Sequence, residues 1–430
     1  MNLKKITILF IAGFIIASVS WKVYDYQTNK KNYNTEINEK EILILDNLYV
    51  SSDKNITSFK ELLTENPDNA DLLIKLSAAY ILKANETGDP EYYTLAEESL
   101  NKIIKNDPEN FPAYAMLGAV YNLRNQFIKA SEFALRSLEI NPYSSFSNGV
   151  LADAQTGLGK YDEAELTIQK MKDKKPDLAA YSRISYIREL KGDTQGAIDT
   201  MKIAISSGLP SAEKTARCRV QLGDLFYNKG DIETAGQIYG FVFKDFPEYA
   251  HGYGTMAKIK MHNNDYPGAI ELYNKALEKN LLPEYLISLG DAYALSGNKE
   301  LADEQYQKAG SLLTSYKQKG MDTDVEKAQF NADLGIDLKE SQEILQKILD
   351  NNSQNIKVYD ALAWTNYKLG NYEEAEKNIK QALRLGTKNP LMYFHAGKIY
   401  EKTGQPDKAK EYLDFALKIN PYYETLSLQN

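Results

Sequence analysis

A pair of small residues recurs along this chain at a fixed separation of twelve residues. In the segment LGDLFYNKGDIETAGQIY the pair is Gly223 and Ala235. Seven further pairs keep the same separation: Gly118 and Ala130, Ala152 and Ala164, Ser185 and Ala197, Ala257 and Ala269, Gly290 and Ala302, Ala363 and Ala375, and Gly397 and Ala409. Successive pairs are mostly 33 to 38 residues apart, a period that is typical of stacked structural repeats.

Each repeat reads as two helices joined by a short turn. When the first small residue is numbered 8, large side chains stand at positions 4, 7 and 11, which share one face of a helix. A turn glycine such as Gly230 follows, and proline often closes the unit at position 32, as at Pro247. Two antiparallel helices approach closely where both are thin, so we expect Gly223 and Ala235 to face each other.

These positions make the chain resemble the tetratricopeptide repeat family, whose units carry Leu-Gly at positions 7 and 8, Tyr at 11, Ala at 20, an aromatic residue at 24 and Pro at 32. The resemblance covers about residues 68–423 and implies an all-α solenoid of helical hairpins wound into a right-handed superhelix. Ten units begin near Ala70, Phe111, Ser145, Leu178, Ala216, Ala250, Pro283, Asp322, Ile356 and Pro390. The preceding segment ITSFKELLTENP is expected to pack on the first unit as a lone second helix.

The chain length of 430 residues therefore measures the number of units, because each unit of a solenoid packs only on its neighbours. The eighth unit lacks a small residue at position 8 and follows the irregular LLTSYKQKGMDTD, so we expect an altered helix angle or a joint near residues 310–325. The predicted organisation is a signal anchor or signal peptide (1–24), a polar tether and lead-in (25–54), a lead-in helix (55–69), repeats one to seven (70–316), a degenerate repeat and joint (317–355), repeats nine and ten (356–423) and a tail (424–430).

The N-terminal segment MNLKKITILFIAGFIIASVSWKVYDY places two lysines before an uncharged run, Ile6 to Trp21. This run is longer than most signal-peptide cores and slightly short for a complete membrane span. We favour an uncleaved membrane anchor with the repeats on the extracytoplasmic side. The small residues Ser18, Val19 and Ser20 keep cleavage open, which would give an exported soluble protein, periplasmic or secreted.

Candidate catalytic residues are few. Cys218 is the only cysteine, which excludes an internal disulfide and a cysteine-based metal cluster. A nucleophile paired with His251 is possible, but a lone thiol on a first helix is expected to be a core residue. His251 and His262 are eleven residues apart, about 16 Å along a helix, too far to share a metal ion. We therefore expect a non-enzymatic protein with no catalytic, cofactor-binding or metal-binding residues.

Positions 2, 5, 9, 12 and 13 of each first helix lie roughly opposite the buried positions. The family resemblance implies that they line a concave groove that holds partner segments. The assigned groove residues are Asp153, Tyr186, Asp224, Tyr227, His251, Lys258, Asp291, Lys357, Trp364, Tyr367, Lys368, Phe394, Lys398 and Lys402. The last two units contribute lysines and aromatic rings, so we expect this end to suit an acidic or carboxylate-ended peptide with an apolar anchor. The position-9 asparagines with which some family members clamp a terminal carboxylate are absent.

A net charge of −8 disfavours nucleic acid as a partner, since binding it needs a dense basic surface. The sequence favours a protein–protein interaction scaffold or adaptor in the cell envelope. Two alternatives stay open: a substrate-presenting accessory factor of an envelope enzyme or glycan-processing assembly, and a self-assembling solenoid. If the solenoid self-assembles, the last helix of unit ten is expected to leave apolar surface for a homo-oligomer at Leu413, Phe415, Ala416 and Ile419.

Overall fold

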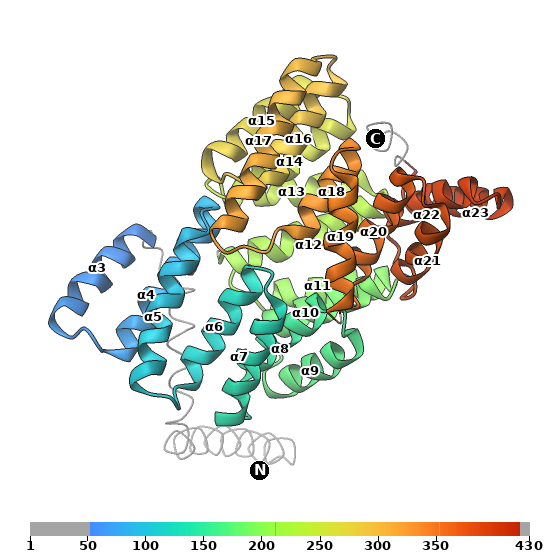
Figure 1. Ribbon diagram of the computed structural model, residues 1–430. Coiled ribbons are helices and arrows are strands. Elements are labelled where there is room, and N and C mark those ends of the chain that lie inside the picture. The colour runs from blue at the N-terminus through green and yellow to red at the C-terminus, as the bar shows by residue number, and fades with distance from the viewer. Residues whose placement is uncertain (1–51, 211, 352, 422–430) are drawn as a thin grey trace, which may run out of the picture. The chain divides into compact units, whose positions relative to one another are not determined.

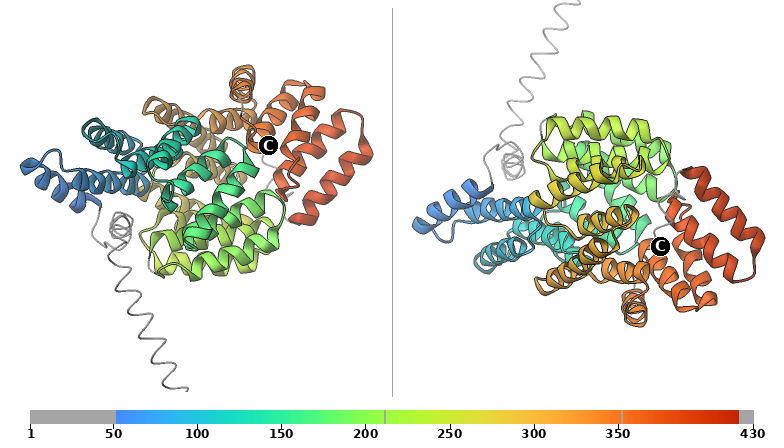
Figure 2. Two further views of the ribbon diagram at one scale, coloured as in Figure 1. Left: turned by 90° about the horizontal axis from the view of Figure 1, so that it is seen from below. Right: turned by 90° about the horizontal axis from the view of Figure 1, so that it is seen from above.

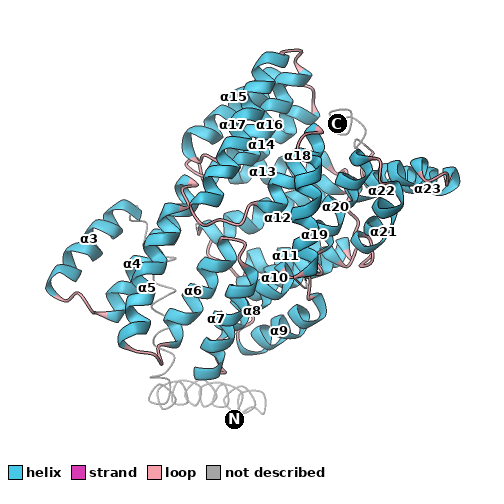
Figure 3. Ribbon diagram, in the orientation of Figure 1, coloured by secondary structure: helices cyan, strands magenta, loops and turns pink. Residues whose placement is uncertain are grey.

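The structure, a computed structural model, describes residues 52–210, 212–351 and 353–421. Within these ranges every regular element is a helix and no strand occurs (Figure 3). The first element is α3 (Ser52–Glu65), which packs on the first helix of unit one and has no partner helix before it in the described part. The all-α solenoid expected from the sequence is confirmed.

Ten helical hairpins follow, and we name the first helix of each unit A and the second B (Figure 1). The A helices are α4 (Ala70–Thr87), α6 (Phe111–Leu123), α8 (Ser145–Gly157), α10 (Leu178–Leu190), α12 (Glu213–Asn228), α14 (Ala250–His262), α16 (Pro283–Leu295), α18 (Asp324–Leu334), α20 (Ile356–Leu369) and α22 (Pro390–Lys402). The B helices are α5 (Glu91–Asn106), α7 (Phe127–Ile140), α9 (Tyr161–Lys174), α11 (Thr194–Ser206), α13 (Ile232–Asp245), α15 (Tyr266–Lys279), α17 (Lys299–Gln318), α19 (Leu338–Asp350), α21 (Tyr372–Ala382) and α23 (Pro406–Ile419).

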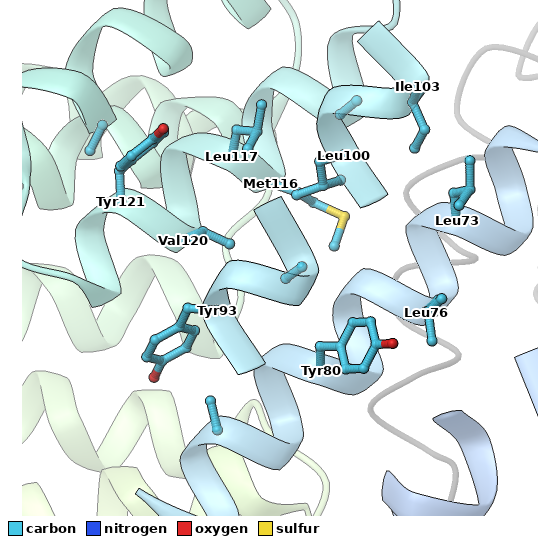
Figure 4. Close-up of a cluster of buried hydrophobic side chains, with 14 of the residues drawn as sticks. Leu73, Leu76, Tyr80, Tyr93, Leu100, Ile103, Met116, Leu117, Val120 and Tyr121 are labelled. Atoms are coloured by element: carbon cyan, nitrogen blue, oxygen red, sulfur yellow. The ribbon is translucent and has the colours of Figure 1, made fainter. Parts of the chain in front are cut away.

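The core is a strip that runs from unit to unit. Each A helix packs most extensively on the B helix of its own unit, and most B helices then pack on the next A helix. Figure 4 shows the first stretch, where Leu100 of α5 meets Leu117 and Val120 of α6. All three side chains are fully buried. Because every unit buries its apolar face on its neighbour, no single central core is needed.

The turns between A and B helices share one backbone device. Gly192 and Gly230 take φ of 77° and 81°, a left-handed conformation that glycine adopts without a steric penalty. The next residues, Asp193 and Asp231, cap the B helix by accepting hydrogen bonds from backbone N–H groups three residues on. The glycine thus ends one helix, and the aspartate starts the next.

At Gly223 and Gly290 the glycine at position 8 makes room for a tyrosine ring of the B helix. A Cβ atom on Gly223 would lie 2.3 Å from the ring of Tyr239, and one on Gly290 would lie 2.5 Å from the ring of Tyr306. Ala235 is fully buried, yet the closest approach to Gly223 comes from the tyrosine one turn beyond it. At Gly118 and Gly397 the carbonyl oxygen of the paired alanine, Ala130 or Ala409, lies 3.1 and 3.2 Å from such a Cβ atom, so in these units the two small residues do face each other.

The irregular segment before unit eight is helical over most of its length. The helix α17 runs without a break to Gln318. Residues 319–323 then form the linker to α18, and Gly320 takes a φ of 87° in it. Within the expected region of 310–325, the chain therefore changes direction only after residue 318.

The second half of the array lies beside the first, with its units in the same order, as the views in Figure 2 show. The linker after unit six meets the A–B turn of unit one, and the linkers after units seven to ten meet the turns of units two to five; we call these five contacts the seam. In three of them a linker N–H donates to a turn carbonyl: Leu281 to Thr87 at 3.3 Å, Asp322 to Arg124 at 2.8 Å and Gln354 to Leu158 at 2.8 Å. One superhelical turn therefore takes five units.

Side chains and glycines complete the seam. The amide groups of three asparagines donate to turn carbonyls: Asn280 to Asn85 at 2.7 Å, Asn355 to Gly157 at 2.9 Å and Asn420 to Tyr227 at 3.2 Å. The linker after unit nine meets the turn of unit four, and there a Cβ atom on Gly192 would lie 2.1 Å from the carbonyl oxygen of Gly386. The backbones of turn and linker meet there directly, which only glycine permits.

The seam also accounts for the pattern of proline at position 32. The linkers after units one, two, three and five carry Pro108, Pro142, Pro176 and Pro247, and none of them belongs to the seam. The corresponding residue after unit six is Leu281, whose N–H makes a seam hydrogen bond. Proline has no N–H to donate. Pro421 lies in the seam all the same, since there the Asn420 side chain is the donor.

The proposed anchor at 6–21, the tether and the tail at 424–430 lie outside the described residues. In the described part of the chain, no helix has both the length and the apolar character that crossing a membrane requires.

Candidate functional site: the inner surface

Units two to five and units eight and nine together line a cavity of 980 Å³. Because its lining comes from both superhelical turns, the cavity lies inside the coil. Phe146, Val325 and Val358 contribute apolar surface, while Gln221 and Asn351 present amide groups. A volume of this size is at the upper end of the range for ligand sites, and the mixture of apolar and amide groups suits a peptide chain.

One wall of this cavity holds an ion pair between neighbouring units. The Nε and Nη2 atoms of Arg183 donate to the two carboxylate oxygens of Asp153 at 2.7 and 2.5 Å. The bidentate geometry strengthens such a pair. Asp153 was assigned to the groove from the sequence, whereas Arg183 was not. The arginine neutralises this aspartate within the protein, so Asp153 shapes the wall and adds little free charge.

A second group gathers in units five and six. Asp224 accepts hydrogen bonds from the Tyr239 hydroxyl at 2.7 Å and from Lys258 Nζ at 3.2 Å. Lys258 Nζ also lies 4.1 Å from the centre of the Tyr227 ring. The structure thus brings together Asp224, Tyr227 and Lys258, three residues that the sequence assigned to the groove. Tyr227 is only 3% exposed, which makes it part of the core.

Carboxyl groups on the inner surface resist ionisation. Burial raises the pKa of Asp291, Glu189 and Asp333 to about 6 in each case. Burial also raises the pKa of Glu284 and Glu326 above the ordinary glutamate value. Solvent reaches several of these side chains, but the protein surrounds them on most sides, which weakens hydration of the charged form.

The residues considered for nucleophilic chemistry are not arranged for it. Burial raises the pKa of the Cys218 thiol to about 11, so the thiol stays protonated at neutral pH. Burial, aided by the charge of Arg217, lowers the pKa of His251 to about 4. His251 Nδ1 lies 2.6 Å from the Tyr285 hydroxyl instead. Among the described residues, no three His, Cys, Asp or Glu side chains are placed to hold a metal ion.

Trp364 is a buried residue that joins three units. Its ring stacks on Tyr367 at 4.8 Å and on His395 at 4.2 Å between centroids, and its Nε1 donates to Asp333 at 3.1 Å. The side chain is 3% exposed. The sequence placed Trp364 in the open groove, and the structure corrects this, because the neighbouring A helices cover the ring. Lys368 Nζ lies 4.9 Å from the centre of the same ring.

The remaining residues of the expected basic end are dispersed. Phe394 is half-buried with its ring 6.3 Å from that of Trp364. Lys398 pairs with Glu401 at 3.0 Å, and Lys402 is exposed. Lys357 instead points to the first superhelical turn, where its Nζ lies 5.9 Å from the centre of the Tyr186 ring. Lys357 and Lys398 therefore have different partners, and neither is a free positive charge in an open groove.

Sequence reasoning missed Arg183, Glu326 and Asp333. Arg183 stands at position 6, outside the positions taken to face the groove. Glu326 and Asp333 belong to the eighth unit, where the missing small residue at position 8 left the facing positions unassigned. Glu326 also meets Asn125, whose Nδ2 donates to it at 3.2 Å across the seam. Local sequence carries no signal for a contact between residues so far apart.

Three segments match family models described as tetratricopeptide repeat: residues 255–310, 356–385 and 391–423. A TPR repeat-containing protein of Methanocaldococcus jannaschii is 24% identical over 343 residues. The alignment covers 78% of this chain and 49% of the relative, so the chain spans about half the length of that protein.

Two solved structures of human IFIT1 are similar in fold. One is a dimer with PPP-AAAA, with a TM-score of 0.50 and 16% identity over 78% of this chain and 77% of the other. The second is a dimer with m7Gppp-AAAA, with a TM-score of 0.50 and 15% identity over 78% and 76% of the two chains. At such low identity the likeness concerns the fold alone. The family-model matches thus show tetratricopeptide repeats within residues 255–423, and the chain is similar over 78% of its length to a TPR repeat-containing protein.

Proposed function

We propose that this protein is a non-enzymatic scaffold that holds a segment of a partner protein inside its superhelical coil. The observation that carries the proposal is the 980 Å³ cavity lined by both superhelical turns. Its apolar patches can bury side chains of the segment, and its amide groups can pair with the segment's backbone. Tetratricopeptide repeats generally act by binding proteins, which supports the same conclusion.

A protein segment fits this surface better than RNA does. The human IFIT1 structures are complexes with PPP-AAAA and m7Gppp-AAAA, so RNA needs to be considered as a ligand. Here, however, three acidic side chains, Asp153, Asp322 and Glu326, stand among the residues that line the cavity. Phosphates brought beside these carboxylates would repel them, and nucleic-acid binding needs a surplus of positive charge.

We further propose that the N-terminal apolar run places this scaffold at a membrane, with the repeats in the cell envelope. The support is the sequence of Ile6 to Trp21, preceded by Lys4 and Lys5. Anchoring would concentrate the array beside envelope partners. Retention of the full-length protein in alkaline-washed membranes tests this placement, and recovery of a soluble chain shortened to begin near Trp21 would contradict it.

Photocrosslinking tests the scaffold function. A benzoylphenylalanine in place of Gln221, an exposed residue of the cavity wall, should form protein adducts in living cells. The matched control replaces Gln381, an exposed residue on α21 that does not line this cavity. Adducts from position 221 alone support the proposal. Adducts to RNA, or equal adducts from both positions, would contradict it.

A further inference from the structure

A second cavity, of 620 Å³, opens at the seam between units four and five of the first turn and units nine and ten of the second. It lies where Gly192 approaches the carbonyl oxygen of Gly386. The two turns meet there without intervening side chains, so the space beside the contact stays open. The cavity adjoins the larger one, and Tyr186 and Lys357 line both.

Positive charge dominates the lining of this second cavity. Four lysines contribute to it: Lys229, Lys357, Lys388 and Lys418. Among the described lining residues, Glu189 is the one acidic side chain. Lys229, Lys388 and Lys418 are exposed at its rim. The chain as a whole has a net charge of −8. The excess of positive charge at this cavity is therefore opposite in sign to the charge of the whole chain.

The floor of the cavity is apolar. Ile198, Leu225 and Met392 are buried beneath it, and Phe415 and Ile419 of the closing helix form a half-buried side. The sequence suggested that Phe415 and Ile419 would be open to a partner or to a second copy of the chain. In the structure they line this cavity. An apolar side chain entering it would bury surface against them, and burial contributes about 25 cal/mol per Å².

We propose that this cavity binds an acidic segment of a partner protein that carries an aliphatic or aromatic anchor residue. The anchor packs on the floor, while carboxylates of the segment pair with the rim lysines Lys229, Lys388 and Lys418. The inference rests on the proposed scaffold function and names the class of partner. Charge complementarity argues for it, since four lysines and one glutamate line the cavity.

Fluorescence polarisation with defined peptides tests this assignment. The probe is labelled Glu-Leu-Glu-Phe-Asp-Leu-Glu, and its counterparts carry lysine at the acidic positions or serine at the apolar ones. The full-length chain should bind the first peptide in a salt-sensitive manner and bind both counterparts at least about tenfold more weakly. Equal binding of all three peptides, or no binding of the first, would overturn the proposal.

Charge reversal locates the binding site. Lys388→Glu with Lys418→Glu should weaken binding of the acidic peptide by about tenfold or more. The matched control, Lys347→Glu with Lys410→Glu, changes exposed lysines outside both cavities and should leave binding unchanged. Circular dichroism and melting curves check that both variants fold. Equal affinities of the two variants would place the peptide elsewhere and overturn the assignment.

If the cavity binds the chain's own tail or RNA instead of a partner segment, the peptide-binding experiments give different results. The sequence after Pro421 contains Glu424, Leu426 and Leu428, so the chain's own tail is one alternative occupant. Binding of the peptide only after removal of residues 422–430 would overturn the proposal and assign the cavity to the tail. Displacement of the peptide by an equal concentration of an RNA oligonucleotide would also overturn it. If the peptide fails while crosslinks from position 221 persist, the partner class is wrong and the scaffold function stands.

Discussion

The hydroxyl of Tyr239 donates a hydrogen bond of 2.7 Å to Asp224, joining the B helix of unit five to the inner face of its A helix. Unit seven repeats the relationship, with 2.8 Å between Tyr306 and Asp291. In both units a glycine at position 8 leaves space for the ring. One residue pattern therefore packs the hairpin and also fixes a carboxylate that faces the interior of the coil.

Substitution of that glycine tests the packing. In Gly290→Ala the new methyl group would lie 2.5 Å from the Tyr306 ring, and overpacking of this kind costs about 1–3 kcal/mol of unfolding free energy. Urea denaturation measures the change. Gly236→Ala is the control, because the nearest atom to its Cβ is 3.9 Å away and alanine favours helix. Equal stability of the two variants would contradict the close approach.

The seam can be opened by removing one donor. Leu281→Pro deletes the N–H that donates to Thr87 and should lower the unfolding free energy by about 1 kcal/mol. Hydrogen exchange measured by mass spectrometry should become faster in residues 84–89. Pro247→Leu, in a linker outside the seam, serves as the control and should leave that segment unchanged. Unaltered exchange in Leu281→Pro would mean that the turns do not depend on this contact.

Stability should depend on the ionisation of Asp291. Burial raises the pKa of Asp291 to about 6, above the ordinary value of 3.8, so the folded state holds this proton more tightly than the unfolded state does. Its contribution to stability is complete below about pH 4 and is lost as the pH rises through about 6. The variant Asp291→Asn has no carboxyl group to ionise at this position, so it does not lose stability in this way as the pH rises. Between about pH 5 and about pH 7.5, the melting temperature of the natural chain should fall by about 1–3 °C more than that of the variant.

Differential scanning calorimetry provides this comparison. Asp407→Asn, on the exposed start of α23, controls for the loss of one negative charge. If Asp291→Asn and the natural chain show the same change with pH, the carboxyl group does not ionise in the way its surroundings indicate.

Cys218 should react slowly while the chain is folded. Burial raises the pKa of its thiol to about 11, and only the thiolate is alkylated. At about pH 8, iodoacetamide should modify the folded protein at least about tenfold more slowly than the urea-unfolded protein, as measured by intact mass. Glutathione in the same solution monitors the reagent. Rapid modification of the folded chain would show that Cys218 is accessible.

Truncation of Trp364 should destabilise the last three units. The ring is 3% exposed and stacked between Tyr367 and His395, and large-to-small changes at such sites cost about 3–5 kcal/mol. Thermal denaturation of Trp364→Ala measures the loss. Lys368→Ala removes a cation beside the ring and should cost about 1 kcal/mol or less. A stable Trp364→Ala protein would show that the ring contributes little to packing.

The sequence predicted the hairpins because their determinants are local. The small residues at positions 8 and 20, the turn glycines such as Gly230 and the helix caps such as Asp231 all act within about 35 residues. These patterns were sufficient to predict the all-α solenoid. They also predicted many of the A-helix positions that face the interior of the coil. They also placed Asp224 and Lys258 on one inner surface.

Only the tertiary structure decided how the units coil and which groove residues stay open. The angle between successive hairpins depends on how their side chains pack, and small differences accumulate over five units before Asp322 meets Arg124. Trp364 stands at a position that faces the groove in the repeat pattern, yet Tyr367 and His395 cover it. The absence of proline at Leu281 becomes informative only once its N–H is seen to bridge the seam. A contact between residues almost two hundred positions apart leaves no periodic signal, because it depends on the summed geometry of every unit between them.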